Sequence, residues 1–133
     1  MIGEIDHVGI AVRSLEEAVI RWRSLLGYKV QAMEDLPERS VRIAMLLKKG
    51  SPPVELITPL LSDSAVGRFL EKRGEGIHHI CYAVDDIEEA VYALKKKGVE
   101  FVGDHPGAGA GGSRTIFIRP GEFNGVLIEL KQK

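Results

Sequence analysis

The chain has 133 residues, enough for one domain to bury a core without disulfides. Its 18 Lys and Arg residues balance 19 Asp and Glu residues, and no basic block stands out. This balance argues against a nucleic-acid partner and against a membrane-surface partner. The single cysteine, Cys81, excludes an internal disulfide, and no apolar stretch approaches about 18 residues. Since no charged-then-apolar leader follows Met1, we expect a cytoplasmic protein. Since the charge is balanced, we expect its partners to be a small molecule and a second copy of itself, as a homodimer.

One segment of the sequence occurs twice. Residues 5–19, IDHVGIAVRSLEEAV, align without a gap on residues 77–91, IHHICYAVDDIEEAV. The offset is 72 residues (77 minus 5), which places His7 on His79 and Asp6 on His78. Because both segments join the same strand pattern to the same helix start, we interpret them as two copies of one structural unit.

Each copy is predicted to begin with a strand and to continue into a helix. Bulky aliphatic residues alternate onto one face of the strand, and small residues share the other face with His7 or His79. In the first copy a capping box at Ser14 and Glu17 begins a helix that ends at Gly27, and the helix of the second copy is predicted to begin near Asp86 and to end at Gly98. We expect both helices to cover the bulky faces, so that the small-residue faces line a cavity.

Three further strands complete each copy. They are predicted at 29–33, 41–48 and 54–59 in the first copy, and at 99–102, 115–119 and 126–131 in the second. Residues 64–73 have a helical pattern. The predicted fold is therefore a single α+β domain, 1–133, with βαβββ modules at 1–61 and 76–133 joined by a connector helix within 62–75. The modules are expected to form one curved, mixed, cavity-lining sheet.

The last strand of each copy carries a glutamate between aliphatic residues, Glu55 or Glu129. A lone strand glutamate commonly faces solvent, and a lone strand histidine is commonly structural. The combination favours a site, because each copy supplies one cavity-face histidine and one such glutamate. A pseudo-twofold relation between the copies brings His7, Glu55, His79 and Glu129 together. His78 has the opposite strand parity from His79, so we predict that it is structural.

Two imidazoles and two carboxylates form a donor set that suits a divalent ion of intermediate hardness. Co²⁺, Mn²⁺, Ni²⁺ and Zn²⁺ fit this description, and Mg²⁺ is a further possibility. Four protein ligands leave about two positions of an octahedral shell open for a substrate. The sequence thus predicts a catalytic metal site rather than a thiolate-bound structural zinc.

Six ordered motifs carry a family resemblance over nearly the whole chain. They are IDHVGIAVRSLEEAV, LPERSV, VELITPL, GIHHICYAVDDIEEAV, FIRP and GVLIEL. Together they resemble the vicinal-oxygen-chelate superfamily and, within it, the methylmalonyl-CoA epimerase family. The resemblance implies metal ligands at His7, Glu55, His79 and Glu129, the four positions that the repeat selects. It also implies a catalytic base at Glu38 in LPERSV, for which a surface role is the alternative.

The resemblance implies epimerisation of (2R)- and (2S)-methylmalonyl-CoA, an acyl-CoA thioester. The proton at C2 is removed and returned through a metal-stabilised enolate, with Co²⁺ the favoured ion. Two acid–base groups are needed, one on each side of the enolate plane. Glu38 is the candidate for the first group, and the metal ligand Glu129 or a further residue that the sequence does not identify is the candidate for the second.

The glycine-rich stretch GAGAGG, residues 107–112, matches the G-x-G-x-x-G pattern of dinucleotide sites. It leads into a predicted strand rather than a helix, so we reject a dinucleotide site. We expect a mobile loop over the cavity instead. Ser113 and Arg114, which follow it, are candidates to bind the phosphates of the substrate.

Three other functions compete with the epimerase. Glyoxalase I (lactoylglutathione lyase) is the main alternative, because its ligands are also two histidines and two glutamates. A non-enzymatic ligand-binding protein on the same fold usually lacks the metal ligands. An extradiol dioxygenase uses Fe²⁺ with two histidines and one glutamate, which leaves Glu55 without a role.

Overall fold

The computed structural model describes all 133 residues, with eight strands, three α-helices and three short 3-10 helices. The chain divides into two compact units: residues 7–78, here the first unit, and residues 1–6 with 79–133, here the second unit. The boundaries fall inside β1 (Ile2–Ala11) and β5 (Gly76–Val84), so each of these strands contributes residues to both units. No helix is both long and apolar enough to cross a membrane. The predicted α+β class is confirmed.

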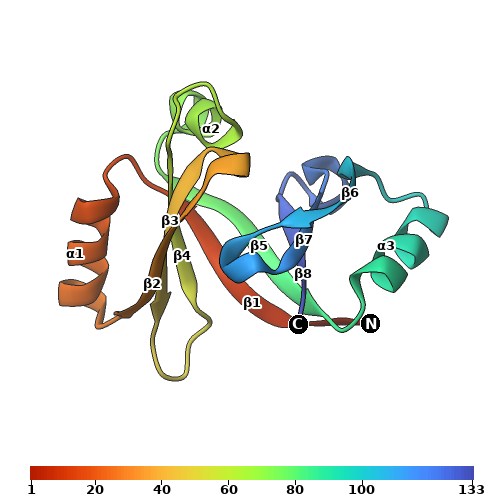
Figure 1. Cartoon of the computed structure of the whole chain (residues 1–133), viewed down its shortest axis with the longest axis horizontal. Helices are drawn as coiled ribbons and strands as arrows, with labels where there is room; N and C mark the ends of the chain where they lie inside the picture. Colours follow the sequence, from red (N-terminus) through yellow and green to blue (C-terminus); the bar gives the residue numbers. More distant parts are fainter. The chain divides into compact units, whose positions relative to one another are not determined.

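The first unit carries the first predicted copy and the connector helix. Besides parts of β1 and β5, it contains α1 (Leu15–Leu26), β2 (Lys29–Leu36), β3 (Val41–Leu47), β4 (Val54–Pro59) and α2 (Ala65–Arg73). Its strands lie in the order β2-β3-β4-β1; β1 is parallel to β4 and the other neighbours are antiparallel. In Figure 1 α1 lies alongside β2, β3 and β4. Its buried residues Leu15 and Val19 pack against Leu46 and Leu56 of this sheet.

The second unit repeats this arrangement with the second copy. Its further elements are α3 (Ile87–Lys96), β6 (Phe101–Ala108), β7 (Arg114–Ile118) and β8 (Ile128–Gln132). Its strands lie in the order β5-β8-β7-β6, and β5 is parallel to β8. Helix α3 buries Ile87 and Val91 against Ile116 and Leu130. The βαβββ order of both copies is confirmed.

The helix starts and stops lie where the sequence motifs predict them. The Ser14 hydroxyl accepts a hydrogen bond from the Glu17 N–H at 3.2 Å, and the Asp86 carboxylate accepts one from the Glu89 N–H at 3.1 Å. Gly27 ends α1 with φ +78°, a conformation that favours glycine. The caps define where the helices begin and end. Both helices pack on the bulky faces of their strands, as predicted.

Two strands are longer than predicted. β2 extends to Leu36. The prediction was too short because this edge strand is mostly exposed and its polar and apolar residues do not alternate regularly. β6 extends to Ala108, and its pairing with β7 shifts between Val102 and Gly107. The predicted loop at 107–112 is therefore wrong in its first two residues, which are strand.

Gly67 in the first turn of α2 gives a test of the connector helix. A Cβ at this position would lie 2.1 Å from the carbonyl oxygen of Ser62, a backbone atom that no side-chain rotation can move. We expect Gly67→Ala to lower the free energy of unfolding by about 1–3 kcal/mol, despite the better helix propensity of alanine. Thermal denaturation measures this effect. Gly107→Ala is the control, since nothing lies within 4 Å of its Cβ position; equal melting temperatures for both variants would contradict the expectation.

Candidate metal and catalytic site

The first unit places His7 and Glu55 on one face of its sheet. Gly9, which shares the face of His7 on β1, lies in register with Glu55 on β4. Both side chains are buried, with 3% of His7 and 5% of Glu55 exposed. Nε2 of His7 lies 3.7 Å from Oε2 of Glu55. Helix α1 packs on the opposite face, so the pair lies on the face of small residues.

The second unit places His79 and Glu129 in the same way. Cys81, which shares the face of His79 on β5, lies in register with Glu129 on β8. Their exposed fractions are 1% and 4%, and Nε2 of His79 lies 3.3 Å from Oε1 of Glu129. The ring of Phe117 from β7 packs edge-on against the His79 ring, with centroids 5.6 Å apart. This contact limits rotation of the imidazole.

The geometry of each pair fits two ligands of one divalent ion. Metal bonds of about 2.0–2.2 Å to nitrogen and oxygen place two neighbouring donor atoms about 2.8–3.6 Å apart. The separation of 3.3 Å lies inside this range, and that of 3.7 Å lies just above it. A bound cation also offsets the cost of burying a carboxylate. The donor set of each unit therefore fits a metal site.

Burial and ring contacts bear on the two commoner alternatives, a solvent-facing strand glutamate and a structural strand histidine. Glu55 and Glu129 do not face solvent, since no more than 5% of either residue is exposed. His78 differs from His79: its ring packs edge-on against Phe69 of α2, with centroids 4.9 Å apart. This contact agrees with a structural role for His78.

Glu38 lies in the 3-10 turn Pro37–Arg39 between β2 and β3. Its side chain is exposed. Ser40 ends the turn with φ +55°, and its carbonyl oxygen accepts a hydrogen bond from the Leu60 N–H at 2.7 Å. The turn is therefore tied to the end of β4, while the Glu38 carboxylate remains accessible.

An ion pair joins β2 and β3 next to this turn. Asp35 and Arg42 are in register, and the Arg42 guanidinium donates hydrogen bonds of 2.6 and 3.1 Å to the two carboxylate oxygens. These hydrogen bonds hold the pKa of Asp35 below its usual range and raise the pKa of Arg42. Arg42 shares its strand face with Ala44 and Leu46, which pack against α1. The pair thus braces the Glu38 turn from the helix side of the sheet.

Ser113 and Arg114 lie at the start of β7, where side chains alternate between two faces. The Arg114 guanidinium forms an ion pair with Glu88 in the first turn of α3. Thr115 lies on the other face, that of Phe117 and Glu129, and is only 3% exposed. The segment before β7 is a 3-10 helix, Ala110–Gly112, and no α-helix follows it, in agreement with the rejected dinucleotide site. Strand alternation in the sequence could have identified Thr115, rather than Arg114, as the residue on the face of Glu129.

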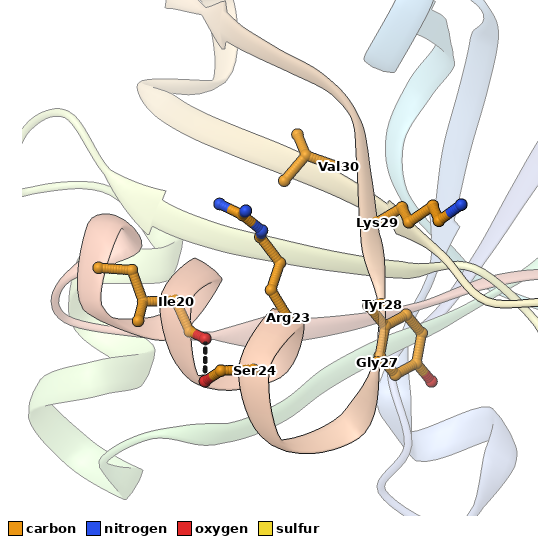
Figure 2. A pocket seen from close by; sticks show the side chains of 7 residues that line it. All are labelled: Ile20, Arg23, Ser24, Gly27, Tyr28, Lys29 and Val30. Carbon is orange, nitrogen blue, oxygen red and sulfur yellow. Dashed lines mark hydrogen bonds between the residues drawn. The ribbon is translucent and has the colours of Figure 1, made fainter.

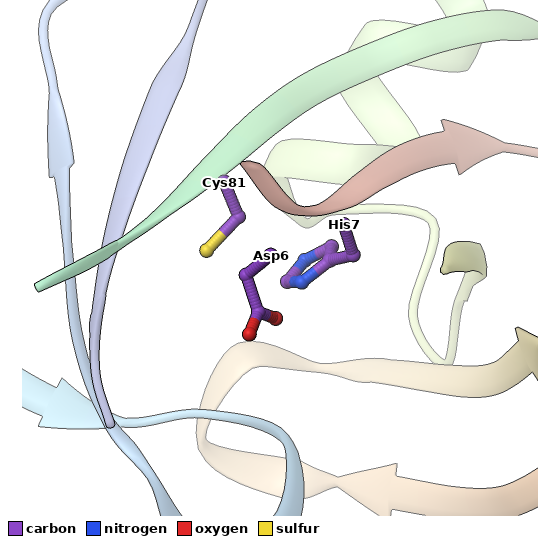
Figure 3. Close-up of side chains that lie close together, drawn as sticks. All are labelled: Asp6, His7 and Cys81. Atoms are coloured by element: carbon purple, nitrogen blue, oxygen red, sulfur yellow. The ribbon is translucent and has the colours of Figure 1, made fainter. Parts of the chain in front are cut away.

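Two charged side chains lie beside the pair of the second unit. Lys131 donates a hydrogen bond of 3.2 Å from Nζ to Oδ2 of Asp6. An oxygen of Asp6 lies within 4.8 Å of the buried thiol of Cys81, and Figure 3 shows these two side chains pointing into one region. Cys81 in turn is in register with Glu129. Neither Asp6 nor Lys131 is among the site residues predicted from the sequence.

An open depression lies at the end of α1, away from these residues (Figure 2). Its lining residues are Ile20, Arg23, Ser24, Gly27, Tyr28, Lys29 and Val30. None of them is a predicted ligand or catalytic residue. Since α1 covers the sheet face opposite Glu55, this depression is not part of the candidate site.

Comparison with known proteins identifies the family of this chain. The model of the Glyoxalase/Bleomycin resistance protein/Dioxygenase superfamily matches residues 6–117. The chain is 42% identical to the ethylmalonyl-CoA/methylmalonyl-CoA epimerase of Cereibacter sphaeroides, over 99% of both chains. A methylmalonyl-CoA epimerase solved with methylmalonyl-CoA and NH₄⁺ is 37% identical, with a TM-score of 0.95 over 100% of this chain and 96% of that one. A Streptomyces coelicolor methylmalonyl-CoA epimerase variant bound to 2-nitronate-propionyl-CoA has the same identity and TM-score, over 100% and 99%.

Proposed function

Because this chain belongs to the Glyoxalase/Bleomycin resistance protein/Dioxygenase superfamily, and within it to the methylmalonyl-CoA epimerase family, we propose that it interconverts the C2 epimers of methylmalonyl-CoA. The observation that carries the proposal is the buried histidine–glutamate pair that recurs in each copy of the repeat. Relatives that align over the whole chain are named for this reaction, and one of them was solved with this thioester.

We propose that His7, Glu55, His79 and Glu129 bind one divalent ion, with Co²⁺ favoured over Mn²⁺, Ni²⁺, Zn²⁺ and Mg²⁺. The distances within each pair and the mixed nitrogen and oxygen donors support this assignment. The ion would supply Lewis-acid stabilisation where negative charge develops on the thioester oxygen. The homodimer and the cytoplasmic location stay predictions from the sequence.

The chain's own residues must then move one proton at C2. In the proposed reaction a carboxylate oxygen of Glu38 accepts the C2 proton on one side of the substrate, and protonated Glu129 donates a proton to C2 on the other side. In the reverse direction the two glutamates exchange these roles. The accessible position of Glu38 on a braced turn supports its assignment as the first base. The strand faces of His7 and His79 otherwise carry small residues, Gly9 and Ala11 on β1 and Cys81 and Ala83 on β5.

The function is tested by exchange of the C2 hydrogen of methylmalonyl-CoA with solvent deuterium, followed by mass spectrometry. We expect the protein loaded with Co²⁺ to catalyse exchange and the chelator-treated protein to lose it. Absence of exchange with every divalent ion tried contradicts the epimerase. The glutathione hemithioacetal of methylglyoxal, assayed in parallel, tests glyoxalase I, and we expect no turnover of that substrate.

A further inference from the structure

The two copies of the repeat supply nearly equivalent halves, whereas the proposed substrate is not symmetric. Methylmalonyl-CoA presents a charged carboxylate on one arm of C2 and a neutral thioester carbonyl on the other. Two pairs of one histidine and one glutamate do not distinguish these arms by charge. A residue that breaks the symmetry of the repeat is therefore needed to set the orientation of the substrate.

Lys131 breaks this symmetry. The two last-strand glutamates are 74 residues apart (129 minus 55), so the repeat partner of Lys131 is Ile57, and the repeat partner of its neighbour Asp6 is His78. The second unit thus carries a cation and a carboxylate, Lys131 and Asp6, where the first unit carries an aliphatic residue and an imidazole, Ile57 and His78. Lys131 lies two residues after Glu129 on β8, so both side chains project from the same face.

Contacts within the second unit connect the Lys131 ammonium to the candidate site. Its Nζ lies 3.2 Å from Oδ2 of Asp6. An Asp6 oxygen lies within 4.8 Å of the Cys81 thiol (Figure 3), and Cys81 is in register with Glu129. Only 24% of the Lys131 side chain and 27% of the Asp6 side chain are exposed. Partial burial strengthens the interaction of such a charge with an anion. The hydrogen bond to Asp6 and the partial burial therefore restrict the position of the Lys131 ammonium.

We propose that Lys131 binds the free carboxylate of the acyl-CoA substrate, and that Asp6 is a positioning residue that holds its ammonium toward the site. This inference rests on the proposed function for the identity of the substrate. A charge-assisted hydrogen bond to a carboxylate selects malonyl-type thioesters over thioesters without that group. Lys131 is then a specificity-determining residue of the site.

The test compares the affinities of malonyl-CoA and propionyl-CoA, which differ by the free carboxylate, using titration calorimetry on the Co²⁺-loaded protein. We expect a preference for malonyl-CoA that Lys131→Met reduces by about 10- to 100-fold and that Lys131→Arg largely keeps. Lys133→Met is the matched control, because Lys133 is exposed and lies beside Asp85. It should leave the preference unchanged.

The double variant Asp6→Asn with Lys131→Met removes the risk that the charge of Asp6, without its lysine, unfolds the protein. It should lose the preference as Lys131→Met does, while Asp6→Asn alone keeps the ammonium but not the carboxylate that positions it, and should reduce the preference less than Lys131→Met does. A preference in the double variant equal to that of the wild type would overturn the inference. Deuterium exchange at C2 is measured separately: a preference for malonyl-CoA that Lys131→Met reduces, in a protein that shows no exchange, supports the Lys131 site and refutes the epimerase. Exchange in a wild type with no preference refutes the Lys131 site alone.

Discussion

His79→Ala is expected to lower the affinity of the protein for a divalent ion by more than about 100-fold, since loss of a residue that only orients a metal ligand already costs about 10- to 100-fold. His79 is 1% exposed, and its Nε2 lies 3.3 Å from Glu129. Calorimetric titration with Co²⁺ measures the change. The same titration reports whether the proposed site binds one ion or more.

His78→Ala is the matched control, because it removes the same side chain from the neighbouring position of β5. His78 packs against Phe69 of α2, so its loss should affect packing and leave Co²⁺ affinity close to that of the wild type. His79→Gln separates loss of a ligand from loss of volume in a buried place. Retained Co²⁺ binding in His79→Ala together with lost binding in His78→Ala would refute the assignment of ligands.

Glu38→Gln is expected to slow exchange of the C2 hydrogen by about 10²- to 10⁴-fold, the usual contribution of a positioned general base. The amide keeps the size of the side chain and cannot accept the proton. Because Glu38 is exposed in a short turn, the substitution should change neither the melting temperature nor Co²⁺ affinity. Deuterium incorporation at C2, measured at saturating substrate, gives the rate of the chemical step.

Glu71→Gln is the control for this prediction, since Glu71 is an exposed glutamate of α2 in the same unit. It should exchange at the wild-type rate. An unchanged exchange rate in Glu38→Gln would show that Glu38 has only a surface role and that another group removes the proton. Slow exchange together with weakened Co²⁺ binding would instead indicate a disturbed site.

Local patterns in the sequence predict the elements of this fold well. The internal repeat, the capping residues Ser14 and Asp86 and the strand parity of His7 and His79 all lie within short segments, where backbone geometry controls which face a side chain takes. The extent of β2 and β6 was predicted less well. An exposed edge strand and an irregular pairing leave little apolar periodicity to recognise.

The sequence by itself determined the repeated βαβββ order and the chemical identity of the two histidine–glutamate pairs. Only the tertiary structure decided that each pair is buried and within ligand distance, that Arg114 turns to Glu88, and that Lys131 meets Asp6 across 125 residues of chain. The physical reason is that alternation along a strand is local, whereas register between strands depends on pairing partners far away in the sequence. A side chain's face can be predicted from its neighbours, but its contacts require the packed sheet.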